Sequence, residues 1–359
     1  MMAMLQALHN LLAGRPAQDV VWTADITYWI AGQGDAAAQS ESGYLALCRD
    51  LSIMPYYWYD RFWLGRPVYD STVDVASETR GDQSVRRWRT PLGDLCEETA
   101  FLPQSSSVGV TRFPVQTQAD LRALLYLIEH RTMVPDCLDD YPARAAMWAA
   151  SDGLPSVALP RSPLAAFLYE WAGMEHGIYL IADYPDLIDH LFKLMEAQES
   201  PIIDAVCQAA PPLIHFADNL SSDNLAGYYD RYMAGGHARR IERLHTAGVK
   251  CAVHLDGTVA ALLPKLASVG FDAIEALTPY PAGDMHIEHM RAAACNDHVI
   301  LWGGIPGIMF APPYTWHDMQ QHVHQLLDAW RDTRFIVGVG DQVPPDGQID
   351  FCRRIAAML

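Results

Sequence analysis

A histidine and two aspartates stand at positions where the ligands of a divalent cation are expected. His254 and Asp256 are two residues apart in an apolar segment, so on a strand both side chains leave the same face. Asp341 directly follows another apolar segment, 334–340. One imidazole and two carboxylates would neutralise a divalent metal and leave a position for substrate. The structural alternative is that His254 bonds Asp256 or a backbone carbonyl, and that Asp341 caps a turn.

Further polar residues lie in or just after other apolar segments. Asp218 and Asn219 end the segment that begins at 211, and Glu275 lies within 272–277. Carboxylates in an apolar layer cost free energy unless they bind something or each other. We therefore predict catalytic roles for these three residues: Asp218 and Asn219 orient the substrate, and Glu275 acts as a base or as a fourth metal ligand.

A second group of residues is predicted to bind the substrate. Trp22 and Asp25 lie in an apolar segment near the amino terminus, and Trp302 lies near the end of 298–304. Glu175 and His176 follow a glycine in WAGMEHG. Tryptophan rings can stack on a substrate, although core packing is the common role of such residues. Glu175 and His176 have an alternative role as a helix-terminal cap.

Five units, each a strand followed by a helix, are expected from residue 211 onward. The strands are near-continuous apolar runs, which is typical of parallel strands buried on both faces. They are expected at 211–218, 249–257, 272–277, 298–304 and 334–340, with helices at 224–246, 258–269, 284–294, 315–330 and 346–358. This α/β pattern predicts a (β/α)8 TIM-type barrel, with an open doubly wound sheet as the alternative. In a barrel the active site lies at the carboxyl ends of the strands, where the polar residues above would meet.

The chain reads as a single domain over residues 1–359, because no linker, repeat or low-complexity run divides it. Residues 1–116 form an aromatic amino-terminal part and lid, and residues 117–359 are expected to form regular βα units. Within the first part, 54–70 is dense in aromatic residues and is expected to form either a lid or an interface. Both interpretations stay open at this point, as does the oligomeric state.

Composition narrows the class of partner. The formal net charge of −18 disfavours nucleic acids and anionic membranes, because a negative field lowers their local concentration. No run approaches the roughly 20 apolar residues that cross a bilayer, and the first residues lack the basic leader of a signal peptide. Seven cysteines are scattered singly. We therefore expect a cytoplasmic protein that acts on a small molecule.

Five segments in order resemble the uroporphyrinogen decarboxylase superfamily, whose fold is a (β/α)8 barrel. They are HFADNLSSDNL, RIERLHTAGVKCAVHLDG, GFDAIEALTPYPAGDM, ILWGGIP and FIVGVGDQVPP. The decarboxylase branch carries an arginine-rich first loop that grips substrate carboxylates. In the matching stretch, RPAQDVVWTADITYWIAG, Arg15, Pro16 and Trp22 remain but the later arginines are missing. This difference speaks against the namesake reaction.

The resemblance is closer to the metal-dependent corrinoid/coenzyme M methyltransferase branch, which carries H-x-C-G on one strand and G-C after the last. The matching positions here are His254-Leu255-Asp256-Gly257 and Gly340-Asp341. The resemblance implies a zinc ion at His254, Asp256 and Asp341 that activates a thiol. It also implies a corrinoid, free or on a partner protein, as the methyl donor or acceptor. Aspartates in place of both cysteines make a harder ligand set that also suits Mn, Fe or Co.

Three hypotheses about function remain open from the sequence. The first is a metal-dependent methyl (one-carbon) transferase acting on a small substrate, with a corrinoid as donor or acceptor. The second is a metal-free decarboxylase or lyase of a small carboxylated substrate, in which His254 donates a proton. The third is a non-catalytic barrel that binds a ligand, against which the five polar strand ends argue.

Overall fold

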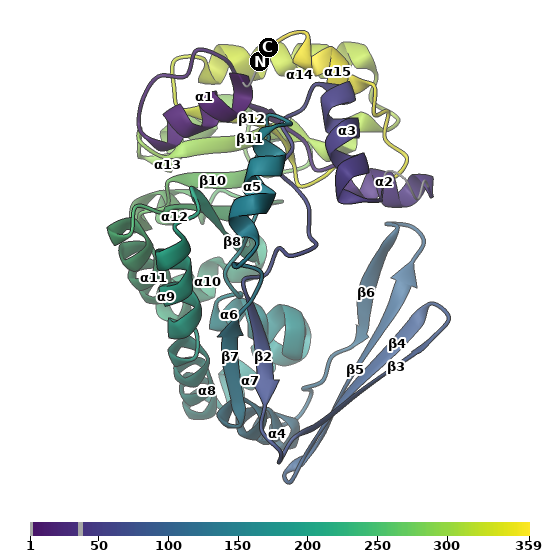
Figure 1. Ribbon diagram of the computed structural model, residues 1–359, viewed down its shortest axis with the longest axis vertical. Coiled ribbons are helices and arrows are strands. Elements are labelled where there is room, and N and C mark those ends of the chain that lie inside the picture. Colours follow the sequence, from purple (N-terminus) through teal and green to yellow (C-terminus); the bar gives the residue numbers. More distant parts are fainter. Residues whose placement is uncertain (1–2, 35–38) are drawn as a thin grey trace.

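A parallel sheet forms the centre of the protein, as the computed structural model in Figure 1 shows for residues 3–34 and 39–359. Six strands lie in the order β1-β12-β11-β10-β9-β8, and every neighbouring pair is parallel. Their bounds are β1 (Trp22–Thr23), β8 (Leu213–Leu220), β9 (Lys250–Leu255), β10 (Ala273–Leu277), β11 (Ile300–Pro306) and β12 (Phe335–Gly340). All residues of β10 and β11 are buried, which explains their near-continuous apolar sequence.

Two extended segments, 53–58 and 154–159, join the two edges of this sheet. The first bonds to β1 and to the second, and the second bonds to β8. The backbone donor–acceptor pairs are Met54 to Trp22, Leu154 to Pro55, Ser156 to Tyr56 and His215 to Val157. Six strands and two extended segments thus form a continuous hydrogen-bonded ring. The predicted TIM-type barrel is confirmed, and the open doubly wound sheet is not the fold.

The helices that follow the last five strands agree with the expected pattern, with one difference. The predicted helix 224–246 is two helices, α10 (Ser222–Tyr232) and α11 (Ala234–Thr246), which meet at Met233 just before Gly235 and Gly236. Met233 has φ −125°, far from the helical value, so the continuous helix breaks at this residue, while both glycines lie inside α11. The remaining helices are α12 (Leu263–Val269), α13 (Ile287–Ala294), α14 (Trp316–Trp330) and α15 (Phe351–Ala356), with a 3₁₀ turn at Gly307–Phe310.

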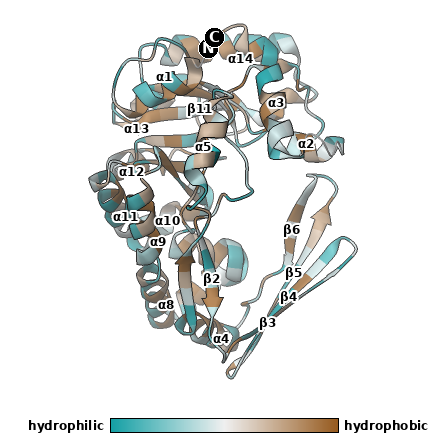
Figure 2. Ribbon diagram, viewed as in Figure 1, coloured by the Kyte–Doolittle hydropathy of each residue, from teal (hydrophilic) through white to brown (hydrophobic). Residues whose placement is uncertain are grey.

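The amino-terminal half is more elaborate than the strand and lid region that the sequence predicted. Strands β2 (Gly65–Tyr69) and β7 (Arg131–Pro135) form an antiparallel pair. Between them in the sequence lie α4 (Gln118–Glu129) and a four-stranded antiparallel sheet made of β3 (Asp74–Arg80), β4 (Gln83–Thr90), β5 (Gly93–Leu102) and β6 (Ser107–Arg112). Figure 1 shows this sheet projecting beside the β2–β7 pair. In Figure 2 hydrophobic and hydrophilic residues alternate along it.

The first 212 residues contain further helices besides α4. They are α1 (Ala3–Leu12), α2 (Thr27–Gln33), α3 (Glu41–Leu51), α5 (Tyr141–Ala149), α6 (Pro163–Ala166), a π-helical turn at Phe167–Trp171, α7 (Met174–Asp183), α8 (Pro185–Ala197) and α9 (Ser200–Ala209). Regular alternation of strand and helix therefore begins at β8 rather than at residue 117. None of the helices in the described part of the chain has the length and apolar character needed to span a membrane.

Two hydrophobic clusters hold these layers together. The smaller one includes residues of α1, the segment 53–58 and the barrel strands, with Trp302 and Tyr56 among its largest members. Their rings lie 4.7 Å apart between centroids. The larger cluster lies between the sheet and the surrounding helices. The cavity described below therefore stands above a packed interior, not an open pore.

A close contact between β10 and β11 gives a test of the barrel. Gly303 has φ +138°, and a Cβ at this position would lie 2.6 Å from the backbone of Leu277. We expect Gly303→Ala to lower the free energy of unfolding by about 2–4 kcal/mol, through backbone strain and overpacking. Gly227→Ala in α10, where no atom lies within 4 Å of the added Cβ, is the control. Urea unfolding should show no loss of unfolding free energy for the control. Equal losses in the two variants would contradict the close contact between β10 and β11.

Candidate active site

A cavity of about 290 Å³ lies at the carboxyl ends of the barrel strands. Five of the residues predicted from the sequence line it: Asp25, Asn219, His254, Glu275 and Asp341. They come from the segment after β1, from β8, β9 and β10, and from the residue after β12. Side chains of the segment 57–63 also form part of its wall. Strands far apart in the sequence therefore contribute polar groups to one small volume.

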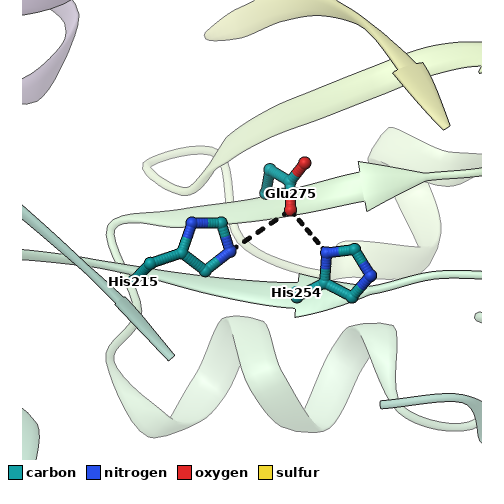
Figure 3. A group of neighbouring side chains, drawn as sticks. All are labelled: His215, His254 and Glu275. Carbon is teal, nitrogen blue, oxygen red and sulfur yellow. Dashed lines mark hydrogen bonds and ion pairs between the residues drawn. The ribbon is translucent and has the colours of Figure 1, made fainter. Parts of the chain in front are cut away.

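The Glu275 carboxylate is the centre of this polar group, as Figure 3 shows. One carboxylate oxygen accepts a hydrogen bond from His254 Nδ1 at 2.8 Å and lies 3.3 Å from His215 Nε2. The other oxygen accepts from the Tyr57 hydroxyl at 2.7 Å. Burial alone would raise the pKa of Glu275, but His254 and His215 stabilise the charged form and lower that pKa well below its usual range. Glu275 is therefore a buried anion.

His254 has one nitrogen satisfied and one free. Its Nδ1 bonds Glu275, whereas its buried Nε2 has no hydrogen-bond partner among the described residues. Burial lowers the pKa of His254, but the neighbouring carboxylates, Glu275 first, outweigh it and raise the pKa to about 9. Buried polar atoms normally have partners, so the free Nε2 marks a position where a further group is expected.

Asp256 and Asp341 complete the predicted ligand set. With His254 they offer three ligand atoms that all lie within 4.8 Å of one another, and His254 Nε2 is 3.9 Å from an Asp341 oxygen. Burial and the neighbouring carboxylates raise the pKa of Asp341 to about 6. Burial also raises the pKa of Asp256, with Glu275 adding to the shift. Negative charge is thus concentrated around the free nitrogen, which favours a cation there.

In a second group, from His215, His254 and Glu275, the ligand atoms also lie within 4.8 Å of one another. In this group, however, Glu275 already accepts from both imidazoles, and the His215 Nδ1 lies 3.3 Å from the Tyr56 hydroxyl. The hydrogen-bonding capacity of these ligand atoms is therefore already used by contacts within the protein. The group with a free donor atom, formed by His254, Asp256 and Asp341, is therefore the better candidate for a metal site.

Asp218, predicted to be catalytic, lies outside the cavity. Alternate residues of β8 face opposite sides of the strand, so Ala217 and Asn219 line the cavity while Asp218 points away from it. Its carboxylate accepts from the Ser162 amide at 2.7 Å and pairs with His237 Nε2 at 2.8 Å. Burial alone would raise the pKa of Asp218, but His237 lowers it, and the net shift is downward. Asp218 is therefore a buried carboxylate whose hydrogen bonds are satisfied by Ser162 and His237.

Four predicted substrate-binding residues also lie away from the cavity. Trp22 is buried in the larger hydrophobic cluster. Trp302 fills the interior beneath the site, where its Nε1 donates to Thr23 Oγ1 at 2.7 Å. Glu175 and His176 are exposed at the start of α7. Of the five substrate-binding candidates, the structure brings only Asp25 to the cavity, where it accepts from the Tyr59 hydroxyl and from Thr27.

Sequence reasoning missed His215 and the tyrosines of the segment 57–63. His215 had a signal, because it precedes Asn219 by four residues on one strand and therefore shares its face. Tyr57 had none: it bonds Glu275 from 218 positions away in the chain. Only the closure of the barrel brings these two residues together.

The fold and the site together define a TIM barrel with a polar cavity at the carboxyl ends of its strands. The chain belongs to the uroporphyrinogen decarboxylase family, because the family model described as Uroporphyrinogen decarboxylase (URO-D) matches residues 152–358. A search of curated proteins found no match.

Solved structures with the same fold include a methyltransferase from Methanosarcina mazei. It is 11% identical, covers 99% of this chain and 97% of its own, and has a TM-score of 0.59. A B12-independent methionine synthase from Shewanella sp. W3-18-1 is 13% identical, with 64% of this chain and 71% of that chain covered and a TM-score of 0.42. At 11% identity the likeness to the Methanosarcina mazei protein concerns the fold alone.

The Asp218–His237 pair predicts a pH-dependent contribution to stability. Because the pKa of folded Asp218 lies below its unfolded value, the contribution is present above that unfolded pKa and is lost as the pH falls through the folded pKa. We expect Asp218→Asn to lower the free energy of unfolding by roughly 3 kcal/mol at pH 7, and by less at pH 3. Urea unfolding at both pH values checks this, with the exposed Asp183→Asn as control. A pH-independent difference would contradict it.

Proposed function

We propose that the protein is a metal-dependent methyl (one-carbon) transferase that acts on a small substrate. The observation that carries the proposal is the unpartnered Nε2 of His254, which lies beside the carboxylates of Asp256 and Asp341 while Glu275 holds the other ring nitrogen. Metal-bound histidines usually donate their second ring N–H to a carboxylate or carbonyl. The arrangement is therefore the one expected around a metal ligand.

The donor set fits a divalent cation. One imidazole nitrogen and two carboxylates suit zinc, and the two oxygen ligands equally suit Mn, Fe or Co. With three protein ligands a coordination position stays open, as in catalytic sites. A metal bound here would supply Lewis acidity that lowers the pKa of a thiol or hydroxyl of the substrate.

The other residues of the cavity have roles that follow from their contacts. Glu275 fixes the orientation and tautomer of His254 and is proposed as a positioning residue, in place of the base or fourth ligand expected from sequence. Asp25, held by Tyr59 and Thr27, presents a second carboxylate to the substrate. Asn219 offers a side-chain amide at the cavity wall. The aromatic segment 57–63 narrows the site and limits the access of water.

Two lines of comparison support methyl transfer over decarboxylation. His254, Asp256 and Asp341 occupy the positions at which the methyltransferase branch carries its ligands, and the neighbour from Methanosarcina mazei is itself a methyltransferase. A corrinoid, which is much larger than the 290 Å³ cavity, would reach the site from outside, either free or on a partner protein. We place the protein in the cytoplasm, since its seven cysteines are all unpaired.

One observation favours a second candidate, the metal-free decarboxylase or lyase. With its pKa at about 9, His254 is an imidazolium at neutral pH in the absence of a metal, and it faces the cavity. An imidazolium at this place can donate a proton to a carbanion left by loss of CO₂. Metal analysis separates the two candidates, because only the transferase needs the metal.

The first test is the metal content of the purified, untagged protein. We expect near-stoichiometric Zn, Mn, Fe or Co in the wild type by mass spectrometry. His254→Ala and Asp341→Ala should each weaken metal affinity by about 100-fold or more, since each ligand supplies a substantial share of the binding free energy.

The controls are His176→Ala and Glu175→Ala, which remove the same chemical groups from the exposed start of α7. Both should keep the metal content of the wild type. A wild-type protein that neither contains nor takes up any of the four metals would reject the transferase and favour the lyase.

A second test addresses the role of Glu275. Glu275→Gln removes the charge that orients His254, so metal affinity should fall by about 10–100-fold, the usual effect of losing such an outer carboxylate. Tyr57→Phe removes one hydrogen bond to Glu275 and should have a smaller effect. Competition with a chromogenic chelator measures both. Unchanged affinity in Glu275→Gln would show that Glu275 does not support the metal site.

A further inference from the structure

A second cavity of about 420 Å³ adjoins the barrel cavity. Trp63 and Arg161 line both cavities, and the Arg161 guanidinium stacks 5.0 Å from the centre of the Trp63 ring. The second cavity, here called the side chamber, lies where the β2–β7 pair, the β3–β6 sheet and the π-helical turn Phe167–Trp171 meet. Nothing in the proposed chemistry of the metal site uses it.

Aromatic rings form one part of the walls of the side chamber, beside charged and small apolar residues. Trp63, Trp88 and Trp171 line it, and the rings of the last two lie 5.2 Å apart at 52°. Trp88 is 3% exposed and Trp171 6%, so these rings are held rigidly by their surroundings. The volume lies within the range of about 300–1,000 Å³ typical of small-molecule pockets. Its size and lining suit an apolar, ring-sized group.

The charges in the chamber leave an excess of positive charge. Two of its glutamates are neutralised, since Glu170 pairs with Arg161 at 3.0 Å and Glu199 forms a buried pair with Arg240. Neither Arg86 nor Arg131 lies within salt-bridge distance of a carboxylate among the described residues, but Arg86 lies directly across the β4–β5 strand pair from Glu97. Glu97 therefore balances the charge of Arg86, and the charge of Arg131 remains in excess. In a protein with a net charge of −18, this local excess indicates a site for a single anionic group.

Two buried hydrogen-bond donors in the lining also indicate a ligand with acceptor oxygens. The Nε1–H of Trp171 and the Nε–H of Arg161 have no acceptor among the residues that the structure describes. Unsatisfied buried donors are costly, and a ligand that carries acceptor oxygens removes the cost. A cationic ligand fits less well, because Arg86 and Arg161 already cover the rings of Trp88 and Trp63.

We propose that the side chamber binds the distal part of the substrate, an apolar ring-sized body that carries one carboxylate. Arg86 and Arg131 bind the carboxylate, and the tryptophans pack against the body. The reactive end passes Trp63 and Arg161 into the barrel cavity. This last step rests on the proposed function, whereas binding in the chamber does not.

The test is calorimetric titration of the full-length protein with 3-phenylpropanoate, its uncharged amide and the matching 3-phenylpropylammonium ion. The carboxylate should bind at least about tenfold more tightly than the amide, as expected for charge-assisted hydrogen bonds. Arg86→Gln and Arg131→Gln should each remove this advantage. Arg87→Gln is the matched control, because Arg87 neighbours Arg86 on β4 but lies on the opposite face and does not line the chamber.

Equal binding of acid and amide, tighter binding of the ammonium ion, or full affinity in Arg86→Gln would overturn the proposal. Because Arg86 is exposed, Arg86→Gln is expected to fold normally. Its affinity for the probe therefore tests the proposal even if a melting experiment shows that Arg131→Gln is unstable. The titration measures binding alone and does not depend on metal. If the protein binds the probe but neither contains nor takes up metal, the transferase proposal is rejected and the proposal of a binding site in the side chamber stands. If it holds metal but does not bind the probe, the side-chamber proposal is rejected and the transferase proposal stands.

Discussion

The buried carboxylate of Glu275 is the interaction on which the rest of the site depends. An unpaired carboxylate in a protein interior costs several kcal/mol, so it is tolerated only with donors around it. Here the donors come from three separate parts of the chain: Tyr57 in the segment 53–58, His215 in β8 and His254 in β9. The same bonds that satisfy the charge therefore tie three parts of the barrel wall to β10 and set the tautomer of His254.

The closed parallel barrel imposes a second constraint, the alternation of side chains between its two faces. Polar residues directed inward at the strand ends meet at the cavity, as His254 and Glu275 do. Polar residues directed outward must find partners among the helices, as Asp218 does with His237. Both kinds of residue are buried and charged. Of these two histidines, His254 keeps a ring nitrogen without a partner among the described residues, whereas both ring nitrogens of His237 have partners, and this separates a site from a structural pair.

The inserted part of the chain between β2 and β7 changes what the barrel can bind. Helix α4 packs against both β5 and β7, so the β3–β6 sheet is held beside the barrel rather than free in solvent. Trp88 and Arg86 on β4 then become part of a wall next to the barrel cavity. Specificity in TIM barrels commonly comes from loops and insertions at this end, while the strands stay the same.

The sequence by itself predicted the last five barrel strands and the three proposed ligands, but not the ring segments 53–58 and 154–159, the first of which falls largely in the stretch 54–70 that was expected to be a lid or an interface. Apolar runs identify buried parallel strands, a spacing of two places His254 and Asp256 on one face, and Asp341 follows the last strand. The sequence did not determine which face of β8 is turned inward. Alternation shows which residues share a face but not which face lines the cavity, and for this reason Asp218 was assigned to the cavity. Tyr57, His215 and the side chamber depend on contacts between segments far apart in the chain. Such contacts exist only once packing closes the barrel, and only the tertiary structure decided them.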